Sequence, residues 1–210
     1  MKELFEKYDN IKNEVQNRII EFKSVWNQAD EKKLFQELAF CLLTPQSKAL
    51  NAWKTILKIT ENNKLFDASK NSISEELNLV RFKNNKASYL VEAREKLFYN
   101  SKGIRETLSE FPSVYEKRKW LLNNIKGYGL KESSHFLRNI GFVEDIAILD
   151  RHILKNLFKF NVIEEIPKSI LEKIYFQIEN QMKEFSNEIK IPLEHLDFIF
   201  WFNETNTIFK

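Results

Sequence analysis

The sequence contains few of the residues that interrupt helices and almost no cysteine. Its 210 residues include four glycines, four prolines and a single cysteine, Cys41. Turn-rich β folds need many more glycines and prolines at their turns, so this composition favours long helices. A single cysteine excludes an intrachain disulfide and a cysteine-ligated zinc or iron–sulfur centre. Because Cys41 lies in the apolar run Leu38–Leu43, we predict that its thiol is buried in the core.

Long apolar runs are also missing. No segment approaches the roughly 18 consecutive apolar residues of a membrane-spanning helix. The N-terminal residues MKELFEKYDNIKNEV are charged where a secretory signal would have an apolar stretch. With 43% hydrophobic and 30% charged residues, the chain has an ordinary globular composition. We therefore expect a soluble cytoplasmic protein without a membrane partner. Its net charge of +3 is mildly basic, as one phosphate-binding face would require.

Apolar residues recur at helical spacing along almost the whole chain. One such stripe consists of Val15, Ile19, Phe22 and Trp26. The dense apolar run over residues 34–43 predicts a buried helix, and Thr44-Pro45 predicts an N-cap and first residue of the next helix. Further helices are predicted around residues 50–57, 86–99, 113–124, 146–160, 167–185 and 192–202. No alternating strand pattern or solenoid repeat is present, so the sequence predicts an all-α fold.

The segment Ile125–Gly141, IKGYGLKESSHFLRNIG, predicts a helix, a tight turn and a second helix. Gly127 and Gly129 allow positive φ and leave the backbone amides uncovered by side chains. The second helix begins near Lys131, so its free N–H groups and positive dipole end face the same turn. We expect this turn, with Lys126 beside it, to bind a DNA phosphate. A glycine-capped turn that binds nothing remains the alternative.

Lys131 is the most informative residue of this segment. A lysine in the first turn of a helix is electrostatically unfavourable, because the helix dipole prefers an acidic residue there. The same positive field disfavours an ammonium and so favours the neutral amine. A neutral amine is the nucleophile that an attack on a sugar C1′ requires. The alternative is a lysine that only contacts phosphate.

Asp150 follows in the segment IAILDRHILKNLF, directly before an apolar periodic run. This position predicts a helix N-cap. A cap can also present one carboxylate oxygen to a cleft. Near Lys131, that carboxylate would stabilise the positive charge that develops on deoxyribose as a base departs, and would assist proton transfer.

These segments together resemble a known family. KGYGLKESSHFLRNIG followed by AILDRHIL is similar to the type-2 8-oxoguanine DNA glycosylases of archaea and some bacteria, within the helix-hairpin-helix superfamily. The likeness extends over LAFCLLTPQSKA, RFKNNKASYLVEAR and the C-terminal WFNETNTIF. It implies an all-α fold of two helical lobes with the active site in the cleft between them. The expected lobes are residues 25–133, with the hairpin, and residues 1–24 plus 134–210.

The resemblance implies a base-excision-repair enzyme with glycosylase and AP lyase activities. Lys131 would form a Schiff base with the sugar, Asp150 would be its catalytic partner, and β-elimination would cut the strand. The expected partner is double-stranded DNA that contains 8-oxoguanine, bound by a monomer at the nucleoid. The resemblance implies no metal and no other cofactor.

Four further residues acquire roles from the resemblance. Gln46 would fill the gap that the flipped nucleotide leaves, Phe82 and Trp201 would sandwich the extruded base, and Lys210 would help to distinguish 8-oxoguanine from guanine. Each has an ordinary alternative. The two aromatic residues would be core residues, Gln46 a polar residue in the first turn of a helix, and Lys210 a frayed terminus.

Three other functions stay open. An endonuclease III-like glycosylase for other oxidised bases shares the hairpin, lysine and aspartate, but usually has a four-cysteine iron–sulfur cluster that Cys41 alone cannot form. A monofunctional glycosylase for alkylated bases lacks the lysine. A non-catalytic helix-hairpin-helix DNA-binding protein is usually short or tandem. His135 and His152 are interpreted as solvated or capping residues rather than acid–base groups.

Overall fold

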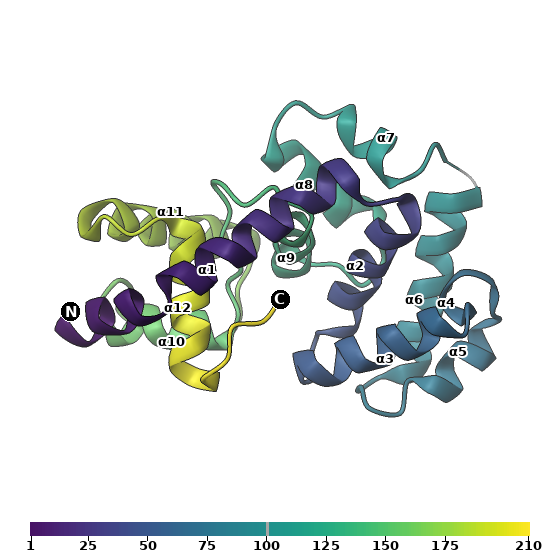
Figure 1. Cartoon of the computed structure of the whole chain (residues 1–210), viewed down its shortest axis with the longest axis horizontal. Coiled ribbons are helices and arrows are strands. Elements are labelled where there is room, and N and C mark those ends of the chain that lie inside the picture. Colours follow the sequence, from purple (N-terminus) through teal and green to yellow (C-terminus); the bar gives the residue numbers. More distant parts are fainter. Residues whose placement is uncertain (100) are drawn as a thin grey trace.

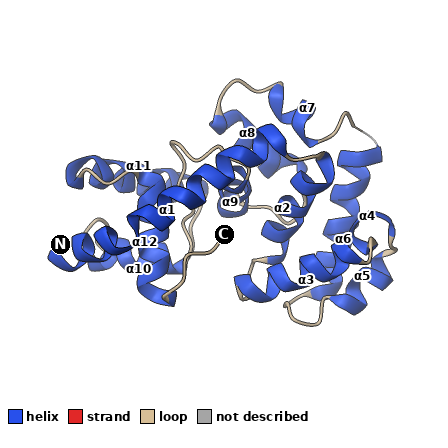
Figure 2. Cartoon of the chain, viewed as in Figure 1, coloured by secondary structure: helices blue, strands red, loops and turns tan. Residues whose placement is uncertain are grey.

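The protein is built from helices that connect through short loops. We describe a computed structural model of the chain, over residues 1–99 and 101–210, in which no strand occurs among these residues (Figure 2). The elements are α1 Lys2–Gln28, α2 Glu31–Leu43, α3 Ala49–Glu61, α4 Lys64–Asp67, α5 Lys70–Glu76, α6 Lys83–Arg94, the π-helix η1 Glu95–Tyr99, α7 Ile104–Ser109, α8 Val114–Asn124, α9 Leu130–Asn139, α10 Arg151–Lys159, α11 Glu172–Ile189 and α12 Leu193–Thr205. The predicted all-α class is confirmed. None of the described helices is long and apolar enough to cross a membrane.

Local capping explains where several helices begin. The Asp30 side chain accepts a hydrogen bond from the Lys33 N–H at the start of α2. At the start of α8, Ser113 and Glu116 form a reciprocal capping box. Such caps satisfy N–H groups that have no partner within the helix.

Two hydrophobic clusters form the interior. The first cluster comes mainly from α2–α9 and includes Leu34, Phe35 and Phe136. The second comes mainly from α1 and α10–α12 and includes Val15 and Leu196. In Figure 1, α10, α11 and α12 lie at one end of the molecule, α2–α7 lie at the other, and the long α1 runs between the ends.

The clusters bear on the predicted lobe boundaries. Phe22 belongs to the second cluster, whereas Val25 and Trp26 pack against the first, close to the predicted boundary at residue 25. Phe136 and Leu137 belong to the first cluster, although the predicted division assigns residues 134–210 to the other lobe. The division therefore stays a prediction.

Three predicted helix starts are wrong, and one of them is that of α11, which begins at Glu172 rather than near residue 167. Thr44 is the C-cap of α2 and Pro45 lies in the turn that follows, so the next helix begins only at Ala49. The segment Ile146–Leu149 is not helical, and α10 begins at Arg151. A short buried apolar run has the same composition in an extended segment as in a helix, so the pattern alone does not separate the two.

Gly141 allows α9 to end against α1. Its φ is +104°, and a Cβ there would lie 2.8 Å from the Phe22 carbonyl oxygen and 2.9 Å from Lys23 Cα. Both contacts are to backbone atoms, which cannot move aside as a flexible side chain would.

We predict that Gly141→Ala lowers the free energy of unfolding by about 1–3 kcal/mol, because it adds left-handed strain to a backbone clash. Urea denaturation measures this loss. Gly129→Ala is the matched control, since Gly129 has φ −110° and its added Cβ would meet only the flexible Glu132 carboxylate at 3.1 Å. Equal losses in the two variants would contradict the close packing of Gly141.

Candidate active site

The turn between α8 and α9 has a left-handed backbone at Gly127, as expected, but not at Gly129. Gly127 has φ +91°, and a Cβ there would lie 2.5 Å from the Tyr89 ring, so only glycine fits. Gly129 is extended and needs no left-handed conformation, which corrects the expectation of positive φ at this residue. The Gly129 N–H donates to the Glu132 carboxylate at 3.1 Å. Lys126, beside the turn, is exposed and pairs with Glu92 at 3.1 Å.

Lys131 lies in the first turn of α9 with its side chain 22% exposed. Its ammonium Nζ lies 3.1 Å from Thr44 Oγ1 and 3.8 Å from the Glu132 carboxylate. The Thr44 hydroxyl donates its own hydrogen to the Cys41 carbonyl at 2.8 Å. The oxygen lone pairs of Thr44 are therefore left to accept from Lys131, which holds the lysine between α9 and the end of α2.

Asp150 is the N-cap of α10, as predicted. Its Oδ1 accepts from the backbone N–H groups of His152 at 2.8 Å and Ile153 at 2.9 Å. Both capping bonds go to one carboxylate oxygen, so the cap does not use the other oxygen. Asp150 is only partly buried. The carboxylate is thus fixed in place by its helix while it remains accessible.

The charges of both Lys131 and Asp150 influence the pKa of Asp197 in α12. Burial raises the pKa of Asp197 to about 6, the nearby Arg138 opposes this shift, the charge of Asp150 raises the pKa further and the charge of Lys131 lowers it. The Asp197 carboxylate lies 3.4 Å from the Arg138 guanidinium. Lys131 forms no ion pair with Asp150 within the described part of the chain; its closest polar partner is Thr44.

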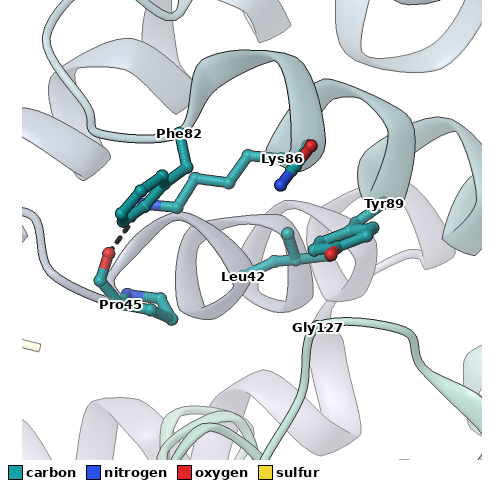
Figure 3. Close-up of a pocket in the computed structure, with 7 residues that line it drawn as sticks. Leu42, Pro45, Phe82, Lys86, Tyr89 and Gly127 are labelled. Atoms are coloured by element: carbon teal, nitrogen blue, oxygen red, sulfur yellow. Dashed lines mark hydrogen bonds between the residues drawn. The ribbon is translucent and has the colours of Figure 1, made fainter.

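A small pocket lies beside the hairpin. Its volume is about 160 Å³, and its lining residues are Leu42, Pro45, Phe82, Asn85, Lys86, Tyr89 and Gly127. Figure 3 shows the Phe82 ring and the Lys86 side chain next to each other above Pro45. Phe82 is 53% exposed and has φ +59°, so the alternative that it is a core residue is wrong.

Lys86 fixes one wall of this pocket. Its buried ammonium donates to the Leu43 carbonyl at 2.7 Å, the Pro45 carbonyl at 2.8 Å and Ser47 Oγ at 3.0 Å. Burial lowers the pKa of Lys86 to about 8. The three acceptors surround the turn after α2, so Lys86 holds the turn that carries Gln46. Gln46 itself is exposed with φ +53° and lies outside any helix, which corrects the alternative of a first-turn residue.

The remaining predicted residues lie elsewhere. Trp201 of α12 is half-buried, and its ring meets the His152 ring edge to face at 5.1 Å. No described contact joins Trp201 to Phe82, so their sandwich stays a prediction. His135 is buried against the Phe40 ring, not solvated, and burial lowers the pKa of His135 well below its usual value.

Lys210 packs against Glu37 and Trp53, so the alternative of a frayed terminus is wrong. Its ammonium pairs with the buried Glu37 carboxylate and lies 3.8 Å from the centroid of the Trp53 ring. Phe209 packs against Phe40. Figure 1 shows the C-terminus between the two ends of the molecule. The last residues therefore cross from α12 to the first cluster.

Sequence reasoning missed Thr44, Glu37, Lys86 and Asp197. Glu37 and Asp197 each carried a detectable signal, because each is a lone acid inside a strongly apolar helical run and such residues are usually paired when buried. Nothing in the sequence joins Thr44 to Lys131. Among residues 1–99 and 101–210, no group of three or more His, Cys, Asp or Glu side chains is arranged to hold a metal ion.

Comparison with known proteins identifies the family. The model of a family described as 8-oxoguanine DNA glycosylase matches residues 15–191. The chain belongs to this 8-oxoguanine DNA glycosylase family. A relative named 8-oxoguanine DNA glycosylase/AP lyase from Fusobacterium nucleatum is 46% identical over 204 residues, which cover 97% of this chain and 94% of the relative.

Solved structures of the 8-oxoguanine DNA glycosylase family share the whole fold. The enzyme from Methanocaldococcus jannaschii, solved in complex with a 15mer DNA containing 8-oxoguanine, matches with a TM-score of 0.88 at 34% identity over all of both chains. The enzyme from Thermotoga maritima matches with a TM-score of 0.88 at 30% identity, covering 100% of this chain and 97% of that one.

The raised pKa of Asp197 predicts a pH-dependent stability. Because the ordinary pKa of 3.8 rises to about 6, the native protein binds this proton more tightly than the unfolded chain does. The stability that the proton contributes is therefore present below about pH 4 and is lost as the pH rises through about 6.

We expect the free energy of unfolding of the wild type, minus that of Asp197→Asn, to fall by up to about 3 kcal/mol between these pH values and to be constant at higher pH. Urea denaturation across this range measures the difference. A difference that rises with pH in this window would contradict the burial assigned to Asp197.

Proposed function

We propose that this protein is a bifunctional DNA glycosylase and AP lyase that removes 8-oxoguanine from double-stranded DNA in base-excision repair. The observation that carries the proposal is the partly exposed Lys131 amine at the hairpin, held by Thr44. The names of the relatives and the fold shared with a DNA-bound family member support the substrate. The enzyme would act at the nucleoid, where its substrate lies.

In this proposal the hairpin binds the DNA backbone. The Gly127 turn and the start of α9 offer backbone N–H groups and a positive dipole end to a phosphate, and Lys126 adds an exposed positive charge. The damaged nucleotide must leave the duplex, because its C1′ is inaccessible in the stack. Gln46, exposed on its turn, would fill the gap, and Phe82 and Trp201 would stack on the extruded base.

Lys131 and Asp150 then carry out the reaction at the sugar. Once Lys131 has lost a proton, its nitrogen lone pair attacks C1′, the C1′–N9 bond breaks, and the bonding pair leaves with the base, which takes up a proton. The fixed Asp150 carboxylate stabilises the positive charge on the sugar. Ring opening gives an iminium that acidifies the C2′ hydrogen, and its removal expels the 3′ phosphate by β-elimination. Water finally hydrolyses the imine and frees Lys131.

The two hydrophobic clusters support a site at a boundary between lobes. Lys131 lies in the first turn of α9, whose buried face belongs to the first cluster, whereas Asp150 is the N-cap of α10, which belongs to the second. We infer that the lobes are approximately residues 25–133 and residues 1–24 plus 134–210, with the reacting groups between them. Lys210, which reaches across this boundary, would take part in base discrimination.

Lys131→Gln should abolish both base removal and strand cleavage while DNA binding and thermal stability are retained, because the amide is no nucleophile. Borohydride trapping on a duplex with one 8-oxoguanine measures the covalent intermediate. Lys12→Gln in α1 removes an equal charge at an exposed residue and should trap normally. A trapped adduct in the Lys131 variant would refute the assignment.

Asp150→Asn should lower the single-turnover rate of base removal by roughly 10²–10³-fold, which is the usual effect of losing one group that stabilises transition-state charge. Asparagine is an equally good N-cap, so circular dichroism and thermal unfolding should change little. A rate within about threefold of the wild type would remove Asp150 from the chemistry.

A further inference from the structure

The segment Ile146–Leu149 places Asp150 in the site. These four residues are buried but not helical, and they run directly into the N-cap of α10. Buried backbone N–H and C=O groups outside a helix or sheet must find other partners. The identity of these partners therefore decides how firmly Asp150 is held.

Two side chains of α11 supply the partners. Glu179 Oε1 accepts from the Ala147 N–H at 2.8 Å. The Tyr175 hydroxyl donates to the Ala147 carbonyl at 2.6 Å, and the Leu149 N–H points to the same hydroxyl at 3.5 Å. Tyr175 and Glu179 are four residues apart, so they lie on the same face of α11. Three backbone groups of the segment are thus tied to one face of one helix.

The same two side chains reach the helix that carries Lys131. Arg118 of α8 donates to both Glu179 oxygens, at 2.6 and 2.9 Å. The Arg118 guanidinium also donates to Ser134 Oγ at 3.2 Å, and the Tyr175 hydroxyl lies 3.3 Å from that oxygen. Ser134 follows Lys131 by one turn of α9. Side chains of α8, α9 and α11 therefore connect the Lys131 helix to the backbone of the Asp150 segment.

The chain between these two elements makes side-chain hydrogen bonds that are exposed, from Tyr115 to the Asp145 carbonyl at 3.2 Å and from Lys23 to Glu144 at 3.4 Å. It is the loop after α9, which contains Gly141 and Asp145, both with positive φ. The Arg118 and Glu179 side chains are each only 2% exposed. A buried ion pair is often no better for stability than apolar residues of the same volume, and its best-attested advantage is a defined geometry.

We propose that Tyr175 and Glu179 are positioning residues, which set the placement of the Asp150 carboxylate relative to the Lys131 amine. This inference rests on the function proposed above for that pair. It assigns to α11, which follows both residues in the chain, a specific part in the reaction.

The first test is Tyr175→Phe, which keeps the buried ring and removes only the hydroxyl. The single-turnover rate of 8-oxoguanine removal should fall by roughly tenfold or more, because small displacements of reacting groups have large effects on rate. The dissociation constant for lesion DNA should stay within about twofold. Ser134→Ala removes the hydroxyl that links this network to α9, and it should also lower the rate.

The matched control is Ser186→Ala. Ser186 lies on the same helix and donates a buried hydrogen bond to the Ile191 carbonyl at 2.6 Å, but among the described residues no hydrogen bond joins it to Ile146–Leu149. Its loss should leave the rate unchanged. Hydrogen–deuterium exchange of the 143–150 peptide should increase in Tyr175→Phe and not in Ser186→Ala.

A double-mutant cycle separates positioning from general destabilisation. If Tyr175 acts through Asp150, Tyr175→Phe should have little further effect on the rate in an Asp150→Asn background. The inference is overturned if Tyr175→Phe and Ser134→Ala lower the rate no more than Ser186→Ala, or if Tyr175→Phe lowers it by the same factor in both backgrounds. An unaltered rate in Asp150→Asn alone would instead remove Asp150 from the proposed chemistry, whereas a wild type that removes no 8-oxoguanine would overturn the proposed function.

Discussion

The buried ion pair between Arg118 and Glu179 is the interaction on which the arrangement of the site depends. Arg118 lies on α8, which packs into the first hydrophobic cluster, and Glu179 lies on α11 in the second. Apolar contact between two clusters is non-directional and does not by itself fix their orientation. Two parallel charge-assisted hydrogen bonds do, because they require one relative geometry. Removing either partner would leave an uncompensated buried charge.

Two other elements cross between the clusters. The long α1 places Phe22 in the second cluster, while Trp26 packs edge to face on Phe142 beside the first. The C-terminal residues cross in the opposite direction, and the Lys210 ammonium is held by Glu37 over the Trp53 ring. Residues 22–26 and the C-terminal residues therefore both connect the two clusters.

Local signals made much of the fold predictable. Helical periodicity predicted the all-α class and most helices, and the Asp150 cap and the Gly127 turn depend only on neighbouring residues. The sequence predicts a helix over Ile146–Leu149, because a buried apolar run has the same pattern whether or not it is helical. Only the contacts of this segment with α11 distinguish the two conformations. Thr44 was misread for a related reason, since Thr-Pro is compatible with a helix start and with the turn after α2.

A site residue was predictable where its charge conflicts with its local backbone environment. Lys131 stands out because a lysine opposes the dipole at a helix start. Its partner Thr44 is 87 residues away in the sequence, and no local pattern links the two. The same holds for Tyr175, Glu179 and Arg118, whose roles arise only when three helices and one non-helical segment meet.

The central claim is that the amine of Lys131, rather than another lysine of the chain, forms the covalent bond to the sugar. The most direct measurement is mass-spectrometric peptide mapping of the adduct that borohydride traps on a duplex with 8-oxoguanine. The account predicts the sugar remnant on Lys131. A remnant on Lys86, Lys210 or any other residue would contradict it.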